Sequence, residues 1–523
     1  MRRRLSDEVG AYEMENQGRN SDHDPSTYSS DTDDSQRAHL LDEGKITQPY
    51  RSGLLQRLFR YVPWSKSFAR RSLRHRQRSI LSRVFLCQCF TAFAAVVTVM
   101  MLVTATLFPS YTNPPARYVE LRKSIEQTET LGAGNPAELK VFIAASIFDK
   151  DGSLATGRWG ECVLALIKIL GPNNVYLSIY ENDAGRIAEE ALNSLERRVE
   201  CKHSLRYDEH LDLNDVEHVV LPDGTSRVKR VAYLSEARNR ALLPLETAGV
   251  AYDRLLYLND VVFDPIEAAQ LLFLTNSDNV LDTSPAYRAA CAVDFDNPIK
   301  YYDTFATRDY EGFGIGLPFF PWFTTAGKGV SRSEVLAGSD AVRVRSCWGG
   351  MVAFDASFFQ PGSTTTPETA GSVAPANMSV PYHFRAEDDL YWDASECCLI
   401  HADIQNSNKS QSGIYMNPYV RTAYDWNTLQ WLGFARRFER LYTPFHWLLS
   451  RAVGMPWYNP RRTEQAWDES QQEIWVPSPD GGSFQQVKRI ASHSGFCGRR
   501  GLQLLKTDRS KNGKMWEEAP VPP

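Results

Sequence analysis

The chain has 523 residues, of which 43% are hydrophobic and 23% charged, and its formal net charge is −5. This length allows two or more ordinary domains, or one large catalytic domain with appendages. A slightly acidic chain is not expected to have nucleic acid as its main partner, because binding to phosphates requires a basic surface.

The N-terminal part of the chain is predicted to be disordered. Its first 50 residues contain few aliphatic side chains and many Ser, Asp, Glu, Asn and Arg residues. Such a segment cannot bury enough apolar surface to offset its conformational entropy. We therefore interpret residues 1–80 as a disordered cytoplasmic tail, whose location follows from the next segment.

Residues 84–108 have the properties of a transmembrane signal anchor. They carry no charge, and a helix of this length rises about 37 Å, enough for a hydrocarbon core of about 30 Å. A cleaved signal peptide is shorter and lies at the extreme N-terminus, which leaves a buried core helix as the alternative. Arginines precede the segment at positions 70, 71, 74, 76, 78 and 83, whereas residues 110–116 are uncharged. The positive-inside rule therefore predicts a single-pass type II arrangement, with everything after the span in the lumen or outside.

Two features agree with a lumenal location for the rest of the chain. Asn377 and Asn408 begin glycosylation sequons. Seven of the nine cysteines follow the span, and none forms a CxxC pair with metal-site spacing. We therefore expect one to three disulfides.

After a predicted stem over residues 109–138, apolar runs alternate with helical patterns. Strands are expected at 141–147, 175–180, 255–258 and 287–294, and helices at 157–170, 184–199, 231–245 and from residue 265. This alternation predicts an α/β domain over residues 139–450 with a mostly parallel sheet.

The later part of the chain is less regular. The apolar stretch 398–400 is interpreted as a further strand. Residues 428–450 have helical spacing and many aromatic side chains, which favours packing against the domain, with acceptor binding or membrane contact as alternatives. Residues 451–523 are rich in Gly, Ser, Lys and Pro, and we expect a loosely ordered C-terminal tail.

Several common catalytic motifs are absent from the sequence. No GxGxxG follows the first strand, and neither GxxxxGK[ST] nor GxSxG occurs. A lumenal α/β sheet with carboxylates beyond its strands suits metal-assisted transfer from a diphosphate-activated sugar. A divalent cation with oxygen ligands neutralises the diphosphate leaving group in such reactions.

The leading candidate for a metal ligand is Asp260, which follows the short apolar strand at 255–258. Open α/β sheets bind their ligands beyond the carboxyl ends of the strands. Asn259 could assist through its amide oxygen or orient Asp260. The alternative is that Asp260 caps the turn before the helix at Pro265.

Five further residues are candidates for the site. Asp296 follows a predicted strand in a D-x-D sequence, and His401 follows an apolar stretch; chance spacing and a structural histidine are the alternatives. Arg238 could bind a diphosphate bidentately, although a solvated helix face explains it equally well. Asp388 and Asp389 could orient or deprotonate an acceptor hydroxyl, or interact with a helix N-terminus.

Seven segments occur in an order that is specific, although each one alone is a weak signal. They are VYLSIYEN (175–182), YLSEARNRALLPLE (233–246), LLYLNDVVFDP (255–265), AACAVDFD (289–296), YYDTFATRDYEG (301–312), SCWGGMVAFDA (346–356) and SECCLIHADIQ (395–405). Together they resemble the fungal capsule-associated α-1,3-mannosyltransferase family, type II Golgi membrane proteins that use GDP-mannose to make capsule and cell-wall polysaccharide. The resemblance covers residues 139–405.

The resemblance implies a GT-A nucleotide-sugar-binding fold and a divalent metal, Mn or Mg, bound by Asp260. Because Asn259 stands where a second carboxylate is expected, Asp296 or His401 would complete the metal site. The other residues carried over are Ala144, Ser146 and Glu181 near the nucleotide, Arg238 at the diphosphate, and Trp348 and Gly349 on the acceptor side. Mannose would pass from GDP-mannose to a mannose-containing glycan or polysaccharide acceptor with retention, and Asp388 and Asp389 are the carboxylates to test as catalytic groups.

Two alternative functions fit the same sequence. The reduced acidic motif Asn259-Asp260 is also consistent with a member of the family that has lost catalysis and acts in polysaccharide assembly or export. A transferase using another nucleotide sugar, such as UDP-xylose or UDP-galactose, is the second alternative, because no motif reads the base or the sugar hydroxyls.

Overall fold

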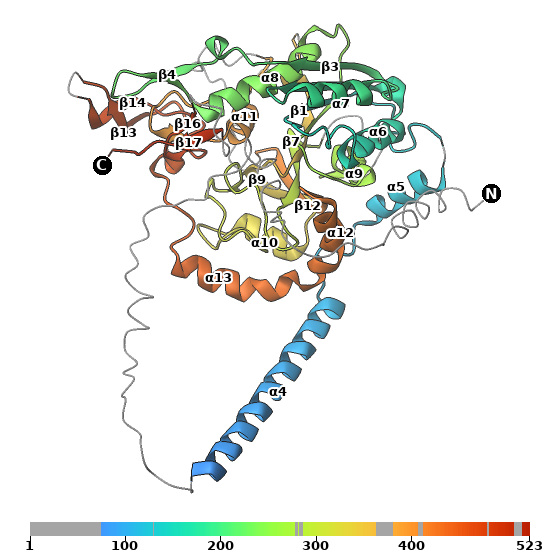
Figure 1. The fold of residues 1–523 in the computed structure, drawn as a ribbon, viewed down its shortest axis with the longest axis vertical. Helices are drawn as coiled ribbons and strands as arrows, with labels where there is room; N and C mark the ends of the chain where they lie inside the picture. Colours follow the sequence, from blue (N-terminus) through green and yellow to red (C-terminus); the bar gives the residue numbers. More distant parts are fainter. Residues whose placement is uncertain are drawn as a thin grey trace, which may run out of the picture.

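The computed structural model describes a folded body from which one long helix projects (Figure 1). The residues described are 75–128, 130–277, 281, 286–361, 380–405, 412–478, 481–506 and 515–522. Most of the predicted tail over 1–80 and both sequons, Asn377 and Asn408, lie outside these residues.

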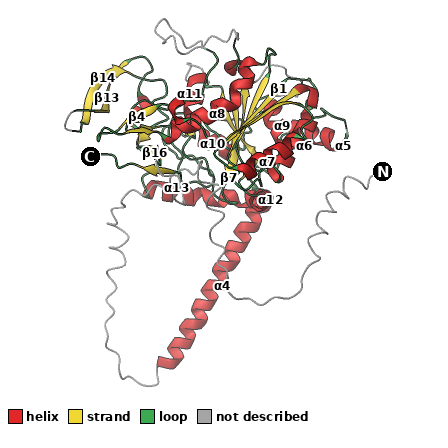
Figure 2. Ribbon diagram, turned by 45° about the horizontal axis from the view of Figure 1, so that its top comes forward, coloured by secondary structure: helices red, strands yellow, loops and turns green. Residues whose placement is uncertain are grey.

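Within the described residues, a mixed sheet of nine strands forms the centre of the body (Figure 2). Its order is β3 (Lys202–Asp208), β2 (Val175–Asn182), β1 (Val141–Ile147), β6 (Arg254–Leu258), β10 (Met351–Asp355), β7 (Ala289–Phe295), β12 (Ile414–Ala423), β9 (Val342–Ser346) and β8 (Arg308–Asp309). β1 is parallel to β2 and β6, whereas β10 runs antiparallel to both β6 and β7. The predicted α/β fold with strands flanked by helices is confirmed. The expectation of a mostly parallel sheet is wrong, because β6–β10, β10–β7, β12–β9 and β9–β8 are antiparallel pairs.

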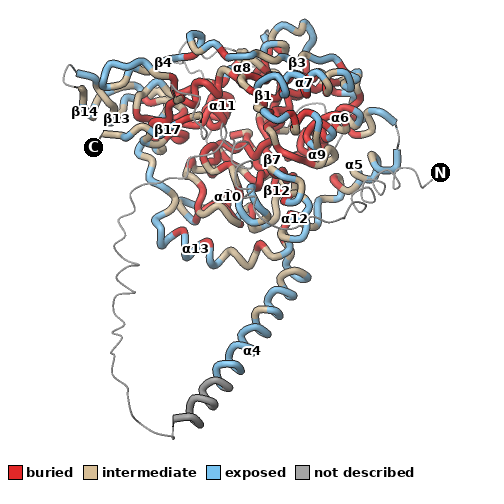
Figure 3. The backbone as a smooth tube through the Cα atoms, in the orientation of Figure 1, coloured by how far each residue is buried: buried red, intermediate tan, exposed pale blue. Residues whose placement is uncertain are grey.

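Both faces of the sheet are covered, which explains why its central strands are apolar throughout. The helices are α6 (Arg158–Leu170), α7 (Arg186–Glu196), α8 (Arg230–Thr247), α9 (Pro265–Leu274) and α10 (Val330–Ala337). Successive β1 residues point to opposite faces: Ile143 belongs to the core under α6 and α9, and Phe142 to the core under α8. Figure 3 shows the buried segments of the body in red.

The predicted strand at residues 398–400 is wrong, because this stretch belongs to helix α11 (Glu396–Ile404). Every residue of α11 is buried, so its sequence lacks the polar face from which a helical period is recognised. The Ser395 side chain caps the helix by accepting a hydrogen bond from the Cys397 backbone. This cap fixes where α11 begins.

The C-terminal segment differs from the loosely ordered tail expected over 451–523. It contains the hairpin β13 (Glu469–Val476) and β14 (Ser483–Ile490), the pair β16 (Gln503–Leu505) and β17 (Trp516–Glu518), and β15 (Arg499–Arg500), which pairs with β11 (Trp392–Asp393). A disulfide joins Cys497 to Cys398 in α11, and Leu502 and Leu504 pack on Tyr391. In the hairpin, polar side chains such as Gln485, Gln486 and Lys488 are exposed.

The projecting helix is α4 (His75–Leu107), and its part Phe85–Leu107 has the length and composition of a membrane span. Such a helix is compatible with a single-pass membrane anchor. Residues 110–127 do not form a separate stem: α5 (Ala116–Gln127) packs on α9, with Tyr118 and Leu121 buried. The predicted helical segment 428–450 is seen as α12 (Trp426–Ala435), the 3₁₀ turns η4 (Arg436–Tyr442) and α13 (Thr443–Ala452).

Candidate functional site

A cavity with an empty volume of about 420 Å³ opens beyond the carboxyl end of β6. It is lined by Arg230, Leu234, Arg238, Asn259, Tyr302, Asp303, Phe305, Trp348, Ser395, Glu396, Cys397 and Tyr424. These residues come from α8, from the ends of β6 and β12, from the loops before β8 and β10, and from the start of α11. This is the edge at which open α/β sheets bind ligands.

Arg238 is the central cation of this cavity. Its Nε donates to Glu396 Oε1 at 3.0 Å and its Nη1 donates to Asn259 Oδ1 at 3.2 Å. The guanidinium carbon lies 4.5 Å from the centroid of a Trp348 ring. Burial by itself lowers the pKa of Arg238, but Cys397 and Glu396 outweigh it and hold the pKa above its ordinary value. A permanent positive charge is therefore fixed in the cavity wall.

Neighbours of Arg238 on α8 behave differently. Arg240 donates to Glu236 at 2.6 Å across one helical turn, the ion pair expected of a solvated helix face. Arg238 has 3% of its surface exposed. The interpretation as a solvated helix face thus applies to Arg240, whereas Arg238 belongs to the candidate site.

Asn259 holds two cavity residues through one amide oxygen. Its Oδ1 accepts hydrogen bonds from Arg238 Nη1 and from Trp348 Nε1, the latter at 3.0 Å. An amide oxygen has two lone pairs, so both are used within the protein. Asn259 therefore positions Arg238 and Trp348 and does not serve as a metal ligand in this arrangement.

Carboxylates also gather around Tyr424, which lines the cavity. Asp294, at the end of β7, is fully buried and accepts hydrogen bonds from the Asp303 backbone at 3.1 Å and from the Tyr424 hydroxyl at 3.3 Å. Burial, and then the charge of Asp303, raise the pKa of Asp294 well above its usual range. Burial first, and then the charges of Asp294, Tyr302, Asp260 and Asp303, raise the pKa of Tyr424. The end of β6 and the end of β7 therefore place acidic side chains around one tyrosine.

Two of the predicted metal ligands lie elsewhere. Asp296 is exposed and pairs with Lys300. His401 is buried in α11, with Nδ1 2.6 Å from the Cys397 carbonyl oxygen and Nε2 3.8 Å from Cys291 Sγ. Burial lowers the pKa of His401 to about 4. Neither residue lines the cavity, and Asp260, next to the lining residue Asn259, is not part of the lining either.

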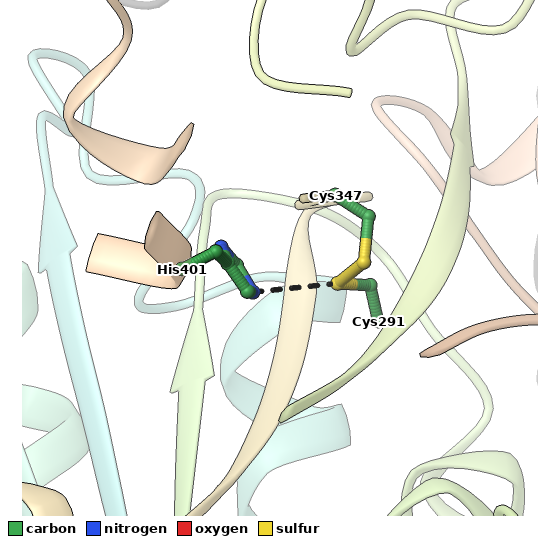
Figure 4. Close-up of side chains that lie close together, drawn as sticks. All are labelled: Cys291, Cys347 and His401. Atoms are coloured by element: carbon green, nitrogen blue, oxygen red, sulfur yellow. Dashed lines mark hydrogen bonds between the residues drawn. A yellow bond between two sulfur atoms is a disulfide. The ribbon is translucent and has the colours of Figure 1, made fainter. Parts of the chain in front are cut away.

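His401 does take part in a compact group of potential ligands, shown in Figure 4. Cys291, Cys347 and His401 form the single such group found in the described part of the chain with all ligand atoms within 4.8 Å of one another. The two cysteines form a disulfide, however, and only a thiolate binds a metal. The histidine therefore packs against a disulfide.

The carboxyl ends of β1 and β2 carry a second buried acidic pair. Glu181 Oε1 accepts a hydrogen bond from the Asp149 backbone at 2.8 Å, while Oε2 is buried without a hydrogen-bond partner among the described residues. Burial raises the pKa of Glu181 to about 7. Nearby, Ser146 accepts a hydrogen bond from Tyr257 at 3.1 Å, and Ala144 is buried in the sheet. Glu181 thus retains capacity to accept a hydrogen bond.

Asp388 and Asp389 lie away from the cavity lining. Asp388 is exposed. Asp389 forms ion pairs with Arg461 and Arg489, each at 2.7 Å. Burial raises the pKa of Asp389, but the two arginines lower it below its usual range overall. In this structure the ion pairs of Asp389 link the C-terminal segment to the body.

The carboxylates that line the cavity, Asp303 and Glu396, were not predicted. Both stand in segments that carry the family resemblance, which was the available signal: Asp303 follows Tyr301-Tyr302, and Glu396 follows the capping Ser395. Neither has a regular spacing from Asp260 that would identify it.

The loop before β10 places Trp348 over Arg238, and glycine is required in it. Gly349 has φ of +64°, and a Cβ at this position would clash with the Ala292 carbonyl. The close approach is therefore to the backbone of β7. It brings Trp348 into the cavity wall.

Comparison with known proteins identifies the family. The sequence model described as cryptococcal mannosyltransferase 1 matches residues 140–403, just over half of the chain. A search of curated proteins gave no match. Among solved structures, the mannosyltransferase PcManGT from Pyrobaculum calidifontis in complex with GDP-Man and Mn²⁺ is 9% identical, covering 69% of this chain and 85% of its own, with a TM-score of 0.30. At that TM-score the likeness carries no argument about function. On the family match, the chain belongs to the cryptococcal mannosyltransferase 1 family.

Proposed function

We propose that the protein transfers mannose from GDP-mannose to a mannose-containing glycan or polysaccharide acceptor, forming an α-1,3 bond with retention. Membership of a mannosyltransferase family supports the sugar and the reaction class. The observation that carries the proposal is the cavity beyond β6, where the buried cation Arg238 lies among acidic residues. Such a wall is suited to a sugar diphosphate with its counter-ion.

Arg238 binds the donor diphosphate in this proposal. Glu396 and Asn259 hold its guanidinium in one orientation, so little conformational entropy is lost when it forms charge-assisted hydrogen bonds. Arg230 also lines the cavity, and its Nη1 donates to Gln503 at 2.9 Å. Two oriented guanidinium groups would stabilise the negative charge that develops on the leaving GDP.

A divalent cation, Mn or Mg, would be held by Asp260 together with Asp303 in place of Asp296 or His401. Support for this fit comes from the grouping of acids at the ends of β6 and β7: the charges of Asp294, Asp260 and Asp303 all act on Tyr424, and Asp303 donates from its backbone to the buried Asp294. These cations are commonly held by one or two carboxylates plus substrate phosphates, so a preformed cage of protein ligands is not required. When bound, the ion neutralises the diphosphate leaving group.

Glu181 recognises the nucleotide in this proposal. Its buried Oε2 can accept one hydrogen bond from a donor on the base or the ribose. Ala144 and Ser146 lie on the neighbouring strand β1, whose register places Ile147 beside Glu181.

For the acceptor step, the carboxylates in the cavity are better placed than Asp388 and Asp389. Retention proceeds either through a carboxylate nucleophile or by attack on the face of the leaving group, and the second route depends on positioning the acceptor hydroxyl. Asp303 and Glu396 line the cavity, although Glu396 is paired with Arg238, whereas Asp389 lies outside the cavity and is neutralised by two arginines. Trp348, held by Asn259, and Gly349 form the acceptor side.

We further propose that α4 anchors the protein in a Golgi or other secretory-pathway membrane as a type II protein, with the body in the lumen. The apolar span Phe85–Leu107 supports anchoring. The disulfides Cys291–Cys347 and Cys398–Cys497 support an oxidising compartment.

The test is to incubate the purified full chain with labelled nucleotide sugars, with and without a chelator. We expect transfer from GDP-mannose that requires Mn²⁺ or Mg²⁺ and stops with the chelator. Transfer only from a UDP-sugar would overturn the choice of donor. Absence of transfer and hydrolysis with every donor would favour a non-catalytic role in polysaccharide assembly.

A further inference from the structure

An exposed apolar surface covers the side of the body from which α4 projects. We define this aromatic surface by Trp431 and Phe434 of α12, Phe445, Trp447 and Leu448 of α13, and Trp457 just beyond it. Their exposed fractions lie between 48% and 61%. In Figures 1 and 2, α12 and α13 lie beside the end of α4 that joins the body.

The orientation of α13 shows that this surface faces outward. His446 and Ser450, one turn apart, are buried, and His446 approaches the Trp322 carbonyl at 3.1 Å. Phe445 and Leu448 therefore lie on the opposite side of the helix. A surface helix ordinarily presents polar residues there. An outward apolar face of this size marks an interaction site.

The charges around the aromatic surface select the kind of partner. Between Trp426 and Tyr458 the sequence contains one acidic residue, Glu439, which is buried and paired with Arg421 at 2.6 Å. Arg437 and Arg451 are exposed. Apolar and aromatic side chains combined with cations and no exposed acid are the composition of protein surfaces that lie in the headgroup region of a membrane.

The connection to α4 places this surface at the bilayer. α4 ends at Leu107, and only Phe108 and Pro109 precede Ser110 and Tyr111, which are 1% and 3% exposed. Arg436 of η4, between α12 and α13, donates to the Tyr111 carbonyl at 3.0 Å. The chain therefore leaves the span and enters the body directly beside the aromatic surface.

A rigid connection then fixes the body relative to the span. Tyr111 donates to the Val335 carbonyl at 3.0 Å, and Arg122 of α5 donates to Asp264 at 2.7 Å. No long flexible stem separates membrane and body in this part of the chain.

We infer that the aromatic surface of α12, η4 and α13 docks into the headgroup region of the bilayer that α4 spans. The catalytic body then lies on the membrane at a fixed orientation. This inference rests on the proposed anchoring by α4. It goes beyond anchoring because a span alone leaves the body free to tilt.

The experiment measures the labelling rate of introduced cysteines in the full chain by a membrane-impermeant maleimide. Leu448→Cys probes the aromatic surface, and Ile187→Cys, at a 60% exposed site on α7, is the matched control. Both are made with Cys87 and Cys89 of α4 replaced by serine. The protein is reconstituted in vesicles with the body outside, and labelling in detergent micelles provides the accessible reference.

We expect vesicles to slow labelling at least tenfold for Leu448→Cys and less than twofold for Ile187→Cys. Equal slowing at both positions, or none at Leu448→Cys while the chain resists alkaline carbonate extraction, would overturn docking and leave the anchor intact. Extraction of the chain by carbonate would overturn the anchor itself, and docking with it. A second variant, with Trp431, Trp447 and Trp457 replaced by phenylalanine, should lose at least half of the fluorescence quenching by lipids brominated in the acyl chain; Trp475→Phe should not.

Discussion

Replacing Arg238 by lysine separates the charge of this residue from its forked geometry. Lysine can retain the ion pair with Glu396, but it cannot also reach Asn259 and stack its head group on Trp348 in the same way. Removing the charge altogether is less informative, because it would leave Glu396 buried without its cation and cost about 3–5 kcal/mol of stability. The lysine variant is therefore expected to fold.

The size of the effect follows from the number of bonds at stake. Each charge-assisted hydrogen bond contributes about 1.5–3 kcal/mol, so loss of one bond to the transferring diphosphate should lower kcat/KM for GDP-mannose by about 10- to 150-fold. Arg240→Lys is the matched control on the same helix, because Arg240 pairs with Glu236 at the surface. A surface pair of this kind contributes about 0.5 kcal/mol.

The assay is steady-state transfer of labelled mannose, with thermal unfolding of both variants as the folding control. Arg238→Lys should lose activity while its Tm stays within a few degrees of the parent, and Arg240→Lys should keep its activity within about twofold. Equal activity in the two variants would refute the assignment of Arg238 to the diphosphate. A loss of activity accompanied by gross unfolding would show that Arg238 acts through stability.

Three further predictions concern the metal, the nucleotide edge and the C-terminal segment. Asp260→Asn should lower Mn²⁺-dependent transfer at least 100-fold while Asp296→Asn, in an exposed ion pair, keeps it within about twofold; similar losses in both would contradict the ligand assignment. Because burial raises the pKa of Glu181 from 4.5 to about 7, the folded chain binds its proton more tightly, so stability should fall as pH rises from 4.5 to 7, by at most about 3 kcal/mol. Urea unfolding at pH 5 and 8 should show this fall reduced in Glu181→Gln, and an unchanged fall would exclude Glu181 as its source. Cys497→Ser opens a disulfide that spans 99 residues of sequence and should cost about 4–5 kcal/mol of unfolding free energy; an unchanged denaturation midpoint would show that the cross-link does not constrain the unfolded chain.

Local patterns in the sequence were sufficient to predict the alternation of strands and helices and the location of Asp260 after a central strand. Apolar runs such as 255–258 are too short for helices and are bounded by turn residues, so they are assigned to strands. The run at 398–400 was wrongly assigned to a strand by the same criterion, because α11 is a helix that is buried on all sides. Tertiary packing determines whether a whole helix is buried, and the spacing of apolar residues in the sequence does not reveal such a helix.

The composition of the site was only partly accessible from the sequence. Arg238 and Trp348 were recognised because their segments resemble a family, but their common partner Asn259 was interpreted from its position beside Asp260. Asp389 was considered free for catalysis because its partners Arg461 and Arg489 lie 72 and 100 residues further along the chain. Pairing over such distances depends on how the C-terminal segment returns to the body.

That return gives the C-terminal segment a part in assembling the cavity wall. α11 carries Glu396, which orients Arg238, and Cys398 of the same helix is joined to Cys497. Cys497 and Gln503 follow all the family segments in the sequence, so a chain that stops before them lacks the covalent partner of α11 and the Gln503 partner of Arg230. The cavity wall therefore depends on contacts made by the C-terminal segment. A chain truncated before Cys497 would carry the family segments without these two supports of the site.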